Sequence, residues 1–342
     1  MLNAAGTSPA AKFRTWRTRA DIALLSITTA RTGDKQTAKI GVLLGGIAPE
    51  RPISLKSGAA VSAALRSRGW NTVDIDVGRD LPAQIVASGI THAWLALHGP
   101  LGEDGCVQGL LEVMRIPYTG SGVRGSAIAM DKIATKRILA TSGITMAQDR
   151  VWRRGDEFPA DITYPVMVKT PEGGSTLGIR KCHDAGELEA GLLYCLDFAG
   201  DVLLEQFVEG YELTVAVLEG EPLPVVKIEP LNEFFDFEAK YQKGKTRYLV
   251  PAPIPPEVAA TAQKYAKSAY DLLGLAGVAR ADFIVDAAGT PWFLEINTLP
   301  GMTETSLSPM AAGQVGISFE DLVERLLRGA RCWVPDFKPG IR

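Results

Sequence analysis

The sequence predicts an α/β protein with three subdomains, and two features of its pattern lead to this fold class. Between residues 39 and 97, strand-like apolar segments alternate with helix-like segments, which is typical of a parallel sheet. From Tyr211 onward, several strand-like segments follow one another with one helix among them, which indicates a largely antiparallel sheet. The predicted units are a basic N-terminal extension (1–38), three α/β subdomains (39–120, 121–204 and 205–330) and a C-terminal tail (331–342).

Composition is that of a soluble globular protein and excludes several functional classes. Of the 342 residues, 46% are apolar and 22% charged, with 36 Lys and Arg against 39 Asp and Glu, a formal net charge of −3. No region is strongly basic, so nucleic acid is not expected as the main partner. No apolar run approaches the roughly 20 residues that cross a bilayer, so no membrane span is expected. Four cysteines without a CxxC pair fit a reducing compartment, and we expect a cytoplasmic location.

The extension at 1–38 is basic and poor in acidic residues. Its apolar stretch at 22–25 is too short for the core of a signal peptide. We interpret it as a flexible extension, with an organelle-type targeting segment as the alternative, and assign it no element of the fold.

The first subdomain begins with a buried-strand pattern, KIGVLL, from Lys39. Ser54 is then expected to cap an alanine-rich helix that ends near Gly69. Alternating segments at 71–77 and 91–97 predict two further strands of a parallel sheet. Ligands of such sheets bind outside the carboxyl ends of the strands, where Gly46 and His98 should lie.

The rest of the chain predicts two more α/β units. In the second, a helical stretch reaches Ser142, and strands at 164–169 and 201–207 flank a helix near 184–195. In the third, strands are expected at TVAVL, VVKIEP, ARADFIV and WFLEIN. The helix between them should start at Pro255-Pro256 and stop at Gly274. Its expected buried stripe consists of Val258, Ala262, Tyr265, Ala269 and Leu272.

The last two strands predict a cluster of carboxylates. The AAGT turn at 287–290 suggests a hairpin in which Asp286 pairs with Pro291, and this register places Asp282 opposite Glu295. One face should then carry Arg280, Asp282, Glu295 and Asn297. The other face should carry Phe283, Val285, Trp292, Leu294 and Ile296.

Two carboxylates at that separation, about 4.5–5.5 Å between Cβ atoms, repel each other unless a positive charge lies between them. Oxygen ligands from Asp, Glu and Asn suit Mg²⁺, particularly beside phosphates of a substrate. The alternative is an exposed polar face in which Arg280 neutralises one carboxylate.

Phosphate-binding candidates are weaker when taken singly. The glycine-rich PEGGSTLG segment (171–178) follows a strand that ends at Lys169, and its backbone N–H groups suit phosphate oxygens. A plain turn is the alternative, since no Gly-Lys-Ser/Thr ends the segment. Taken singly, Lys132, Lys169 and Lys240 are each interpreted as solvated surface cations.

Taken together, an ordered set of motifs between about Ile40 and Leu327 resembles the D-alanine–D-alanine ligases of the ATP-grasp superfamily. The motifs are LLGGIAPERPIS, ALHGPLGEDG, YTGSG followed by MDK, VMVKTPEGGSTLG, EAKY and LEINTLPGMTETSLSPMAA. The resemblance implies an ATP-grasp fold with a Rossmann-like N-terminal subdomain, a central α/β subdomain and a largely antiparallel α+β C-terminal subdomain.

The resemblance also implies a reaction in two steps. ATP would phosphorylate the carboxylate of one D-alanine, and the amine of a second would attack the acyl phosphate to give D-alanyl-D-alanine for peptidoglycan synthesis. The implied cofactors are ATP as co-substrate and Mg²⁺ or Mn²⁺, in two ions. A homodimer is expected from the family alone.

Residue roles follow from the same resemblance, motif by motif. The residues that would bind ATP are Lys132, Lys169, Glu205, Gln206, Val208, Glu212 and Lys240. The metal ligands would be Asp282, Glu295 and Asn297. The residues with catalytic roles would be Glu50, Ser175, Tyr241, Arg280, Gly301 and Ser306.

Substrate contacts are implied in more detail. Glu50 would pair with the ammonium group of the first D-alanine, with His98 nearby, while Ser306 and the Leu307 backbone would hold the second. Arg280 and the Gly301 N–H would stabilise the oxyanion. Ser175 and Tyr241 would link the loop over the site to Glu50, and the tyrosine favours D-alanine as the acceptor.

Two alternatives remain open. A sister ligase would use D-lactate or D-serine as acceptor, and an inactive relative would bind ATP without catalysis. The chain departs from the family pattern at Ile47-Ala48, Pro52, Thr170 and Gln206, and the first two bear on the fit around the first D-alanine. The extension and the C-terminal tail match nothing in the pattern.

Overall fold

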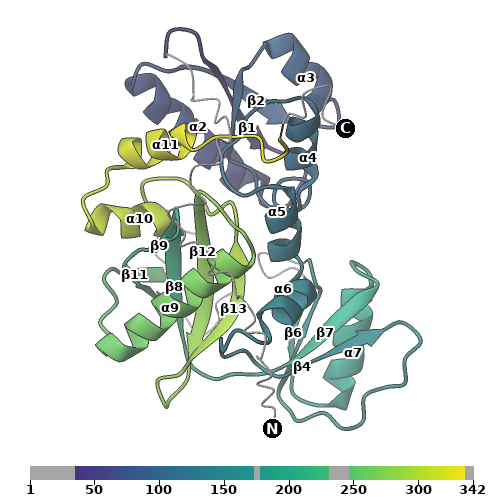
Figure 1. Ribbon diagram of the computed structural model, residues 1–342. Helices are drawn as coiled ribbons and strands as arrows, with labels where there is room; N and C mark the ends of the chain where they lie inside the picture. Colours follow the sequence, from purple (N-terminus) through teal and green to yellow (C-terminus); the bar gives the residue numbers. More distant parts are fainter. Residues whose placement is uncertain (1–34, 173–177, 231–245, 336–342) are drawn as a thin grey trace, which may run out of the picture.

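The computed structural model describes residues 35–172, 178–230 and 246–335. Three sheets form separate units along the chain, with the N-terminal unit stacked above the C-terminal one and the small central unit beside the latter (Figure 1). No helix in these ranges combines the length and apolar character that a membrane span requires. The mixed α/β architecture predicted from the sequence is confirmed, whereas the subdomain bounds remain a prediction.

The N-terminal unit contains the predicted parallel sheet, in the order β2-β1-β3. Its strands are β1 (Lys39–Gly45), β2 (Asn71–Val77) and β3 (His92–Leu95), and its helices are α2 (Arg51–Ser67), α3 (Leu81–Ser88) and α4 (Cys106–Val113). The prediction that Ser54 caps α2 is wrong. The N-cap is Glu50, because Pro52 suits the first turn of a helix, and Ser54 inside it donates to the Ala96 carbonyl at 2.6 Å.

The central unit is a four-stranded antiparallel sheet in the order β4-β7-β5-β6. Its elements are α5 (Val123–Met130), α6 (Lys132–Leu139), β4 (Asp149–Arg153), β5 (Val166–Lys169), β6 (Ile179–Cys182), α7 (Ala185–Leu196) and β7 (Asp201–Gln206). The outer strands β4 and β6 were not predicted, because their exposed sequences DRVWR and IRKC lack a clean alternation of apolar residues.

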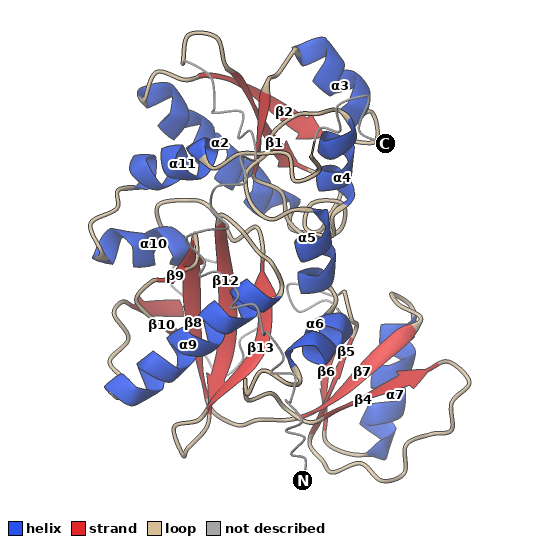
Figure 2. Cartoon of the chain, viewed as in Figure 1, coloured by secondary structure: helices blue, strands red, loops and turns tan. Residues whose placement is uncertain are grey.

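The C-terminal unit is an antiparallel sheet in the order β11-β10-β8-β12-β13, with β9 paired to β8. Its strands are β8 (Tyr211–Leu218), β9 (Glu221–Pro222), β10 (Val226–Pro230), β11 (Thr246–Leu249), β12 (Val278–Val285) and β13 (Pro291–Asn297). Its helices are α9 (Pro256–Leu272), α10 (Leu307–Gln314) and α11 (Phe319–Arg328). Helix α9 lies across this sheet, whereas α11 reaches back to α2 of the N-terminal unit (Figure 2).

The predicted hairpin register is right at the carboxylates but wrong at the turn. Val285, not Asp286, pairs with Pro291, and a bulge at Leu294 restores the register so that Asp282 faces Glu295. Because of the bulge, the residues before Leu294 lie on the opposite face from the one predicted. Phe293 packs in the core, where its ring lies 5.7 Å from that of Phe283. The prediction that Trp292 and Leu294 share the face of Phe283 is therefore wrong, and both are half-buried.

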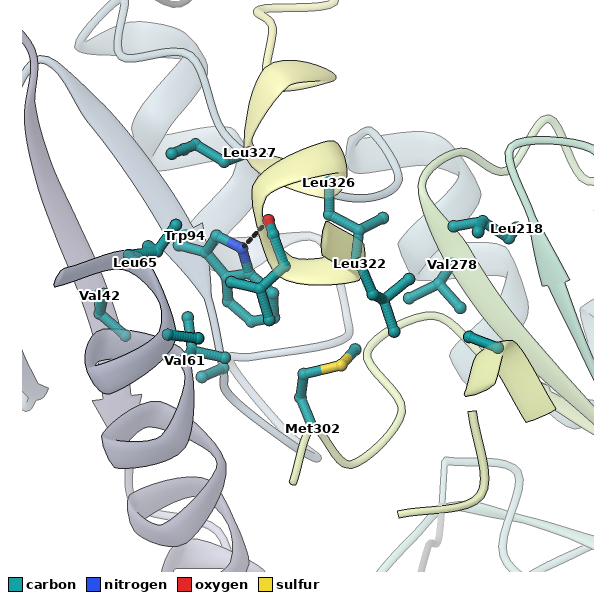
Figure 3. Close-up of a cluster of buried hydrophobic side chains, with 14 of the residues drawn as sticks. Val42, Val61, Leu65, Trp94, Leu218, Val278, Met302, Leu322, Leu326 and Leu327 are labelled. Atoms are coloured by element: carbon teal, nitrogen blue, oxygen red, sulfur yellow. Dashed lines mark hydrogen bonds between the residues drawn. The ribbon is translucent and has the colours of Figure 1, made fainter. Parts of the chain in front are cut away.

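A shared apolar core joins the N-terminal and C-terminal units (Figure 3). Trp94 of β3 packs against α11, and its indole N–H donates to the Val323 carbonyl at 3.5 Å. Met302, in the loop after β13, enters the same cluster. Because this loop is anchored in the core, it is held against the carboxyl end of the parallel sheet.

The stripe predicted for α9 is correct except at its end. Val258, Ala262 and Ala269 are buried, and Tyr265 is half-buried, but Leu272 is 53% exposed. Its neighbour Leu273, which is 2% exposed, fills the core instead.

We predict that Leu273→Ala lowers the free energy of unfolding by about 2–5 kcal/mol, because it leaves a cavity in a packed core. Leu272→Ala should change it by no more than about 0.5 kcal/mol, as an exposed position does. Urea denaturation of both variants checks this, and equal losses would contradict the assigned face.

Candidate active site

A ring of polar groups surrounds the place where the three units meet. It is formed by the carboxyl end of the parallel sheet, the β12–β13 hairpin, the loop after β13, and α6 with the ends of β5 and β7. The predicted residues outside the described ranges are Ser175, Lys240 and Tyr241. Their roles stay predictions.

Asp282 and Glu295 face each other on β12 and β13, as predicted, and each has a cation beside it. Arg280 donates to both oxygens of Asp282, from Nε at 2.9 Å and Nη2 at 2.8 Å. Lys132 at the start of α6 lies 3.0 Å from Glu295. The two cations offset the repulsion between the carboxylates, and they come from different units of the protein.

Asn297 and Thr214 complete the surroundings of Asp282. The Asn297 side-chain amide donates to Asp282 Oδ2 at 3.2 Å, and the Thr214 hydroxyl donates to Oδ1 at 2.6 Å. Both carboxylates are half-buried, so the alternative of a fully exposed polar face does not hold, although the Arg280–Asp282 pair that it included is present.

The set of two carboxylates and one amide oxygen fits a divalent cation that prefers oxygen ligands. It is smaller than a three-carboxylate cage, and no group of three or more His, Cys, Asp or Glu suited to a metal occurs in the parts of the chain that the structure describes. Such a set leaves coordination positions for water and phosphate oxygens, which is typical of Mg²⁺ with a nucleotide.

A second part of the site lies at the end of the parallel sheet. Glu50 Oε2 and His98 Nε2 are both buried, and neither has a hydrogen-bond partner within the described ranges. Burial and the nearby charge of Arg280 lower the pKa of His98 to about 4, although a hydrogen bond with the Leu299 backbone opposes this shift. The imidazole is therefore neutral at pH 7. Since buried polar atoms are normally paired, these two indicate a place for a polar ligand.

The loop after β13 contributes the third part. Ser306 is the N-cap residue of α10, and its hydroxyl accepts from the Thr303 N–H at 3.0 Å. A Cβ on Gly301 would lie 3.2 Å from the Ser306 oxygen, so the Gly301 backbone and that hydroxyl are neighbours. Leu307 is the first residue of α10. The predicted acceptor residues are therefore brought together.

Lys169 and Glu205 belong to a buried network of charges. The Glu205 carboxylate pairs with Lys169 of β5 and with Lys136 of α6. Lys136 also donates to the Ala147 carbonyl at 2.7 Å. Burial alone would raise the pKa of Glu205, but the two lysines outweigh it and hold the pKa below its usual value. Lys132 and Lys169 are both buried, so neither is a solvated surface cation.

The remaining residues predicted around the nucleotide lie where the central sheet passes into the C-terminal one. Gln206 ends β7 and is exposed, Val208 follows it and is half-buried, and Glu212 lies near the start of β8, paired in register with Ile284 of β12. Their positions line one edge of the junction between the two units.

Two buried charged residues that contact predicted site segments, Lys136 and Glu103, had no predicted role. Lys136 lies one helical turn after Lys132, and this i, i+4 spacing on one face was the available signal. Glu103 lies within the quoted ALHGPLGEDG motif without an assigned role.

We predict that Lys136→Met lowers the free energy of unfolding by about 3 kcal/mol, because it leaves a buried carboxylate with one cation fewer. The adjacent Arg137 is an exposed partner of Asp149, and Arg137→Met should cost no more than about 1 kcal/mol.

Since the pKa of Glu205 in the folded protein is lowered, its stabilising effect is present at neutral pH and is lost as the pH falls through that folded-state pKa. Denaturation at pH 7 and at pH 4 should therefore show a smaller difference between Lys136→Met and wild type at the lower pH.

Comparison with known proteins identifies the family. A family model described as the D-ala D-ala ligase C-terminus matches residues 138–328, and one described as the D-ala D-ala ligase N-terminus matches residues 78–121.

Relatives and solved structures agree over most of the chain. A D-alanine–D-alanine ligase of Syntrophotalea carbinolica is 49% identical over 86% of this chain and 97% of its own, and one of Geobacter sulfurreducens is 46% identical over 86% and 95%. The crystal structure of the Bacillus anthracis enzyme superimposes with a TM-score of 0.77 at 34% identity, covering 85% of this chain and 96% of that one. The same enzyme complexed with ATP gives a TM-score of 0.75 at 32% identity, with the same coverage. The chain belongs to the D-alanine–D-alanine ligase family.

Proposed function

We propose that this protein joins two D-alanines into D-alanyl-D-alanine at the expense of ATP, through a D-alanyl phosphate, for peptidoglycan synthesis. The observation that supports it most is the proximity of two unlike sites. One contains the buried, unpartnered polar atoms of Glu50 and His98, which suit a small zwitterion, and the other is the carboxylate pair with its two cations. Arg280 lies between them, since it is bonded to Asp282 and its charge acts on His98.

Phosphoryl transfer depends mainly on positioning and on neutralising charge. Asp282, Glu295 and Asn297 would hold Mg²⁺, which supplies positive charge at the phosphates when bound. Lys132 lies next to the same carboxylates and Lys169 lies at the end of β5, so both are placed to meet phosphate oxygens. Glu205 keeps Lys169 in position until a nucleotide competes for it.

The substrate amino acid would be oriented by charge. Its ammonium group suits the unpartnered oxygen of Glu50, which is the N-cap residue of α2. When the second D-alanine attacks, negative charge develops on the carbonyl oxygen. Arg280 and the Gly301 N–H are the donors that would stabilise it, with Ser306 and Leu307 on the acceptor side.

A direct test is product analysis by mass spectrometry after incubation with ATP, Mg²⁺ and D-alanine. The expected products are D-alanyl-D-alanine, ADP and phosphate, with turnover abolished by EDTA. Parallel reactions with D-lactate or D-serine as acceptor test the sister activities. ATP binding without D-alanine-dependent ADP formation would contradict the proposal.

A homodimer in the cytoplasm is also proposed, on the family resemblance alone. Sedimentation equilibrium of the full chain tests the first part, with twice the monomer mass of 36.6 kDa as the expected result.

We predict that Glu50→Gln raises KM for the first D-alanine by about 10–100-fold, as loss of one charge-assisted hydrogen bond does. KM for ATP should stay unchanged, because Glu50 lies at the other part of the site. Initial rates with each substrate varied separately measure both constants, and an unchanged KM for D-alanine would remove Glu50 from this role.

We predict that Arg280→Ala lowers kcat by on the order of 10²–10³, the usual effect of losing an oxyanion donor. Arg280→Lys keeps the charge but loses the two parallel hydrogen bonds to Asp282, so its kcat should fall between that of Arg280→Ala and wild type. A wild-type kcat in Arg280→Ala would show that the guanidinium does not act on the transition state.

A further inference from the structure

Glu103 lies in the turn after β3, where its side chain is buried. We propose that Glu103 is a positioning residue that holds two active-site loops in fixed register. One is the turn with His98 and Gly99, and the other is the segment from Leu299 to Gly301 after β13. The proposal rests on the ligase function above and deepens it, because it states what holds Glu50 and His98 in place relative to the proposed oxyanion donors.

The carboxylate of Glu103 joins segments that are distant in sequence. Its Oε2 accepts from the Gly99 N–H at 2.9 Å, and its Oε1 accepts from the Leu299 N–H at 3.1 Å. Its own backbone N–H donates to the Gly99 carbonyl at 2.9 Å and so closes the turn. One side chain therefore shapes the turn and ties it to a loop of the C-terminal unit.

Gly99 lies between Glu103 and Glu50. It adopts a φ of +64°, and a Cβ there would lie 3.0 Å from Glu50 Oε2 and 3.1 Å from the Ala48 Cβ. The Gly99 backbone thus lies directly beside the Glu50 oxygen. A shift of this turn would change the space for the substrate ammonium.

Leu299 transmits the effect on the opposite side. Its backbone is hydrogen-bonded to His98, and Gly301 follows two residues later. The Met302 N–H donates to the Ser57 hydroxyl of α2 at 3.0 Å, which gives the segment a second anchor beyond Gly301. The Gly301 N–H therefore lies between two points that are bonded to the N-terminal unit.

A carboxylate suits this place because both of its oxygens accept hydrogen bonds. The pKa of Glu103 is raised to about 7, mainly by burial. The two backbone N–H groups and the charge of Arg280 oppose this rise, whereas the charge of Glu50 adds to it. An uncompensated carboxylate would be costly here, so the two N–H bonds explain how it is accommodated. An amide of the same shape offers one acceptor and would point its NH₂ group at the other N–H.

The test compares Glu103→Gln with Asp104→Asn. Asp104 is the matched control, because it also accepts two backbone N–H bonds, from Leu101 at 2.7 Å and Cys106 at 2.9 Å, but both lie in its own loop. Glu103→Gln should lower kcat/KM for D-alanine by on the order of 10–100-fold, as misplaced reacting groups do, with KM for ATP unchanged. Asp104→Asn should leave both near wild type.

Hydrogen exchange without substrates provides a readout that does not depend on catalysis. In wild type, the Leu299 amide should exchange as slowly as amides of β13, and in Glu103→Gln it should exchange at least tenfold faster. A wild-type Leu299 amide that exchanges like an exposed loop would overturn the proposal even if the variant failed to fold.

Three further outcomes have distinct meanings. Unchanged D-alanine kinetics in Glu103→Gln, or equal losses for D-alanine and ATP, would overturn the positioning role. Wild-type protein that makes no dipeptide, yet shows the predicted exchange pattern, would count against the proposed function while the link between the loops stands.

Discussion

The candidate active site depends on holding two carboxylates, Asp282 and Glu295, opposite each other on neighbouring strands. Their charges are offset by Arg280 from the same hairpin and by Lys132 from α6 of the central unit. The Lys132–Glu295 pair therefore does more than prevent repulsion, because it connects the two units between which a nucleotide would bind. A divalent cation with phosphates would offer the same carboxylates a stronger counter-charge, and would leave Lys132 able to turn toward a phosphate.

The N-terminal unit is placed against this centre by apolar packing. The core that includes Trp94, Met302 and Leu326 spans both units, so the loop after β13 cannot shift without disturbing buried contacts (Figure 3). Within this packed arrangement, hydrogen bonds from polar groups position the individual loops of the candidate site. Glu50, His98 and Glu103 lie buried in one region, so the groups proposed to bind and position the substrate are withdrawn from water.

Much of this arrangement could be predicted from the sequence, because strand alternation and motif order are local signals. The opposition of Asp282 and Glu295 followed from a hairpin pattern, yet the bulge at Leu294 was not visible, since one extra residue leaves no mark in a short strand. Leu272 was placed inside because a regular helical stripe was extended to the last residue of α9, where Leu273 fills the core instead. The roles of Lys136 and Glu103 depend on contacts with residues remote in sequence, which no local pattern reveals.

The metal site can be located directly in a crystal structure with ADP and Mn²⁺, because anomalous scattering identifies the metal. We expect a peak about 2.2 Å from oxygens of Asp282, Glu295 and Asn297, with nucleotide phosphate oxygens completing its coordination. A peak elsewhere, with the Arg280–Asp282 and Lys132–Glu295 pairs unchanged and no metal at either carboxylate, would contradict this assignment.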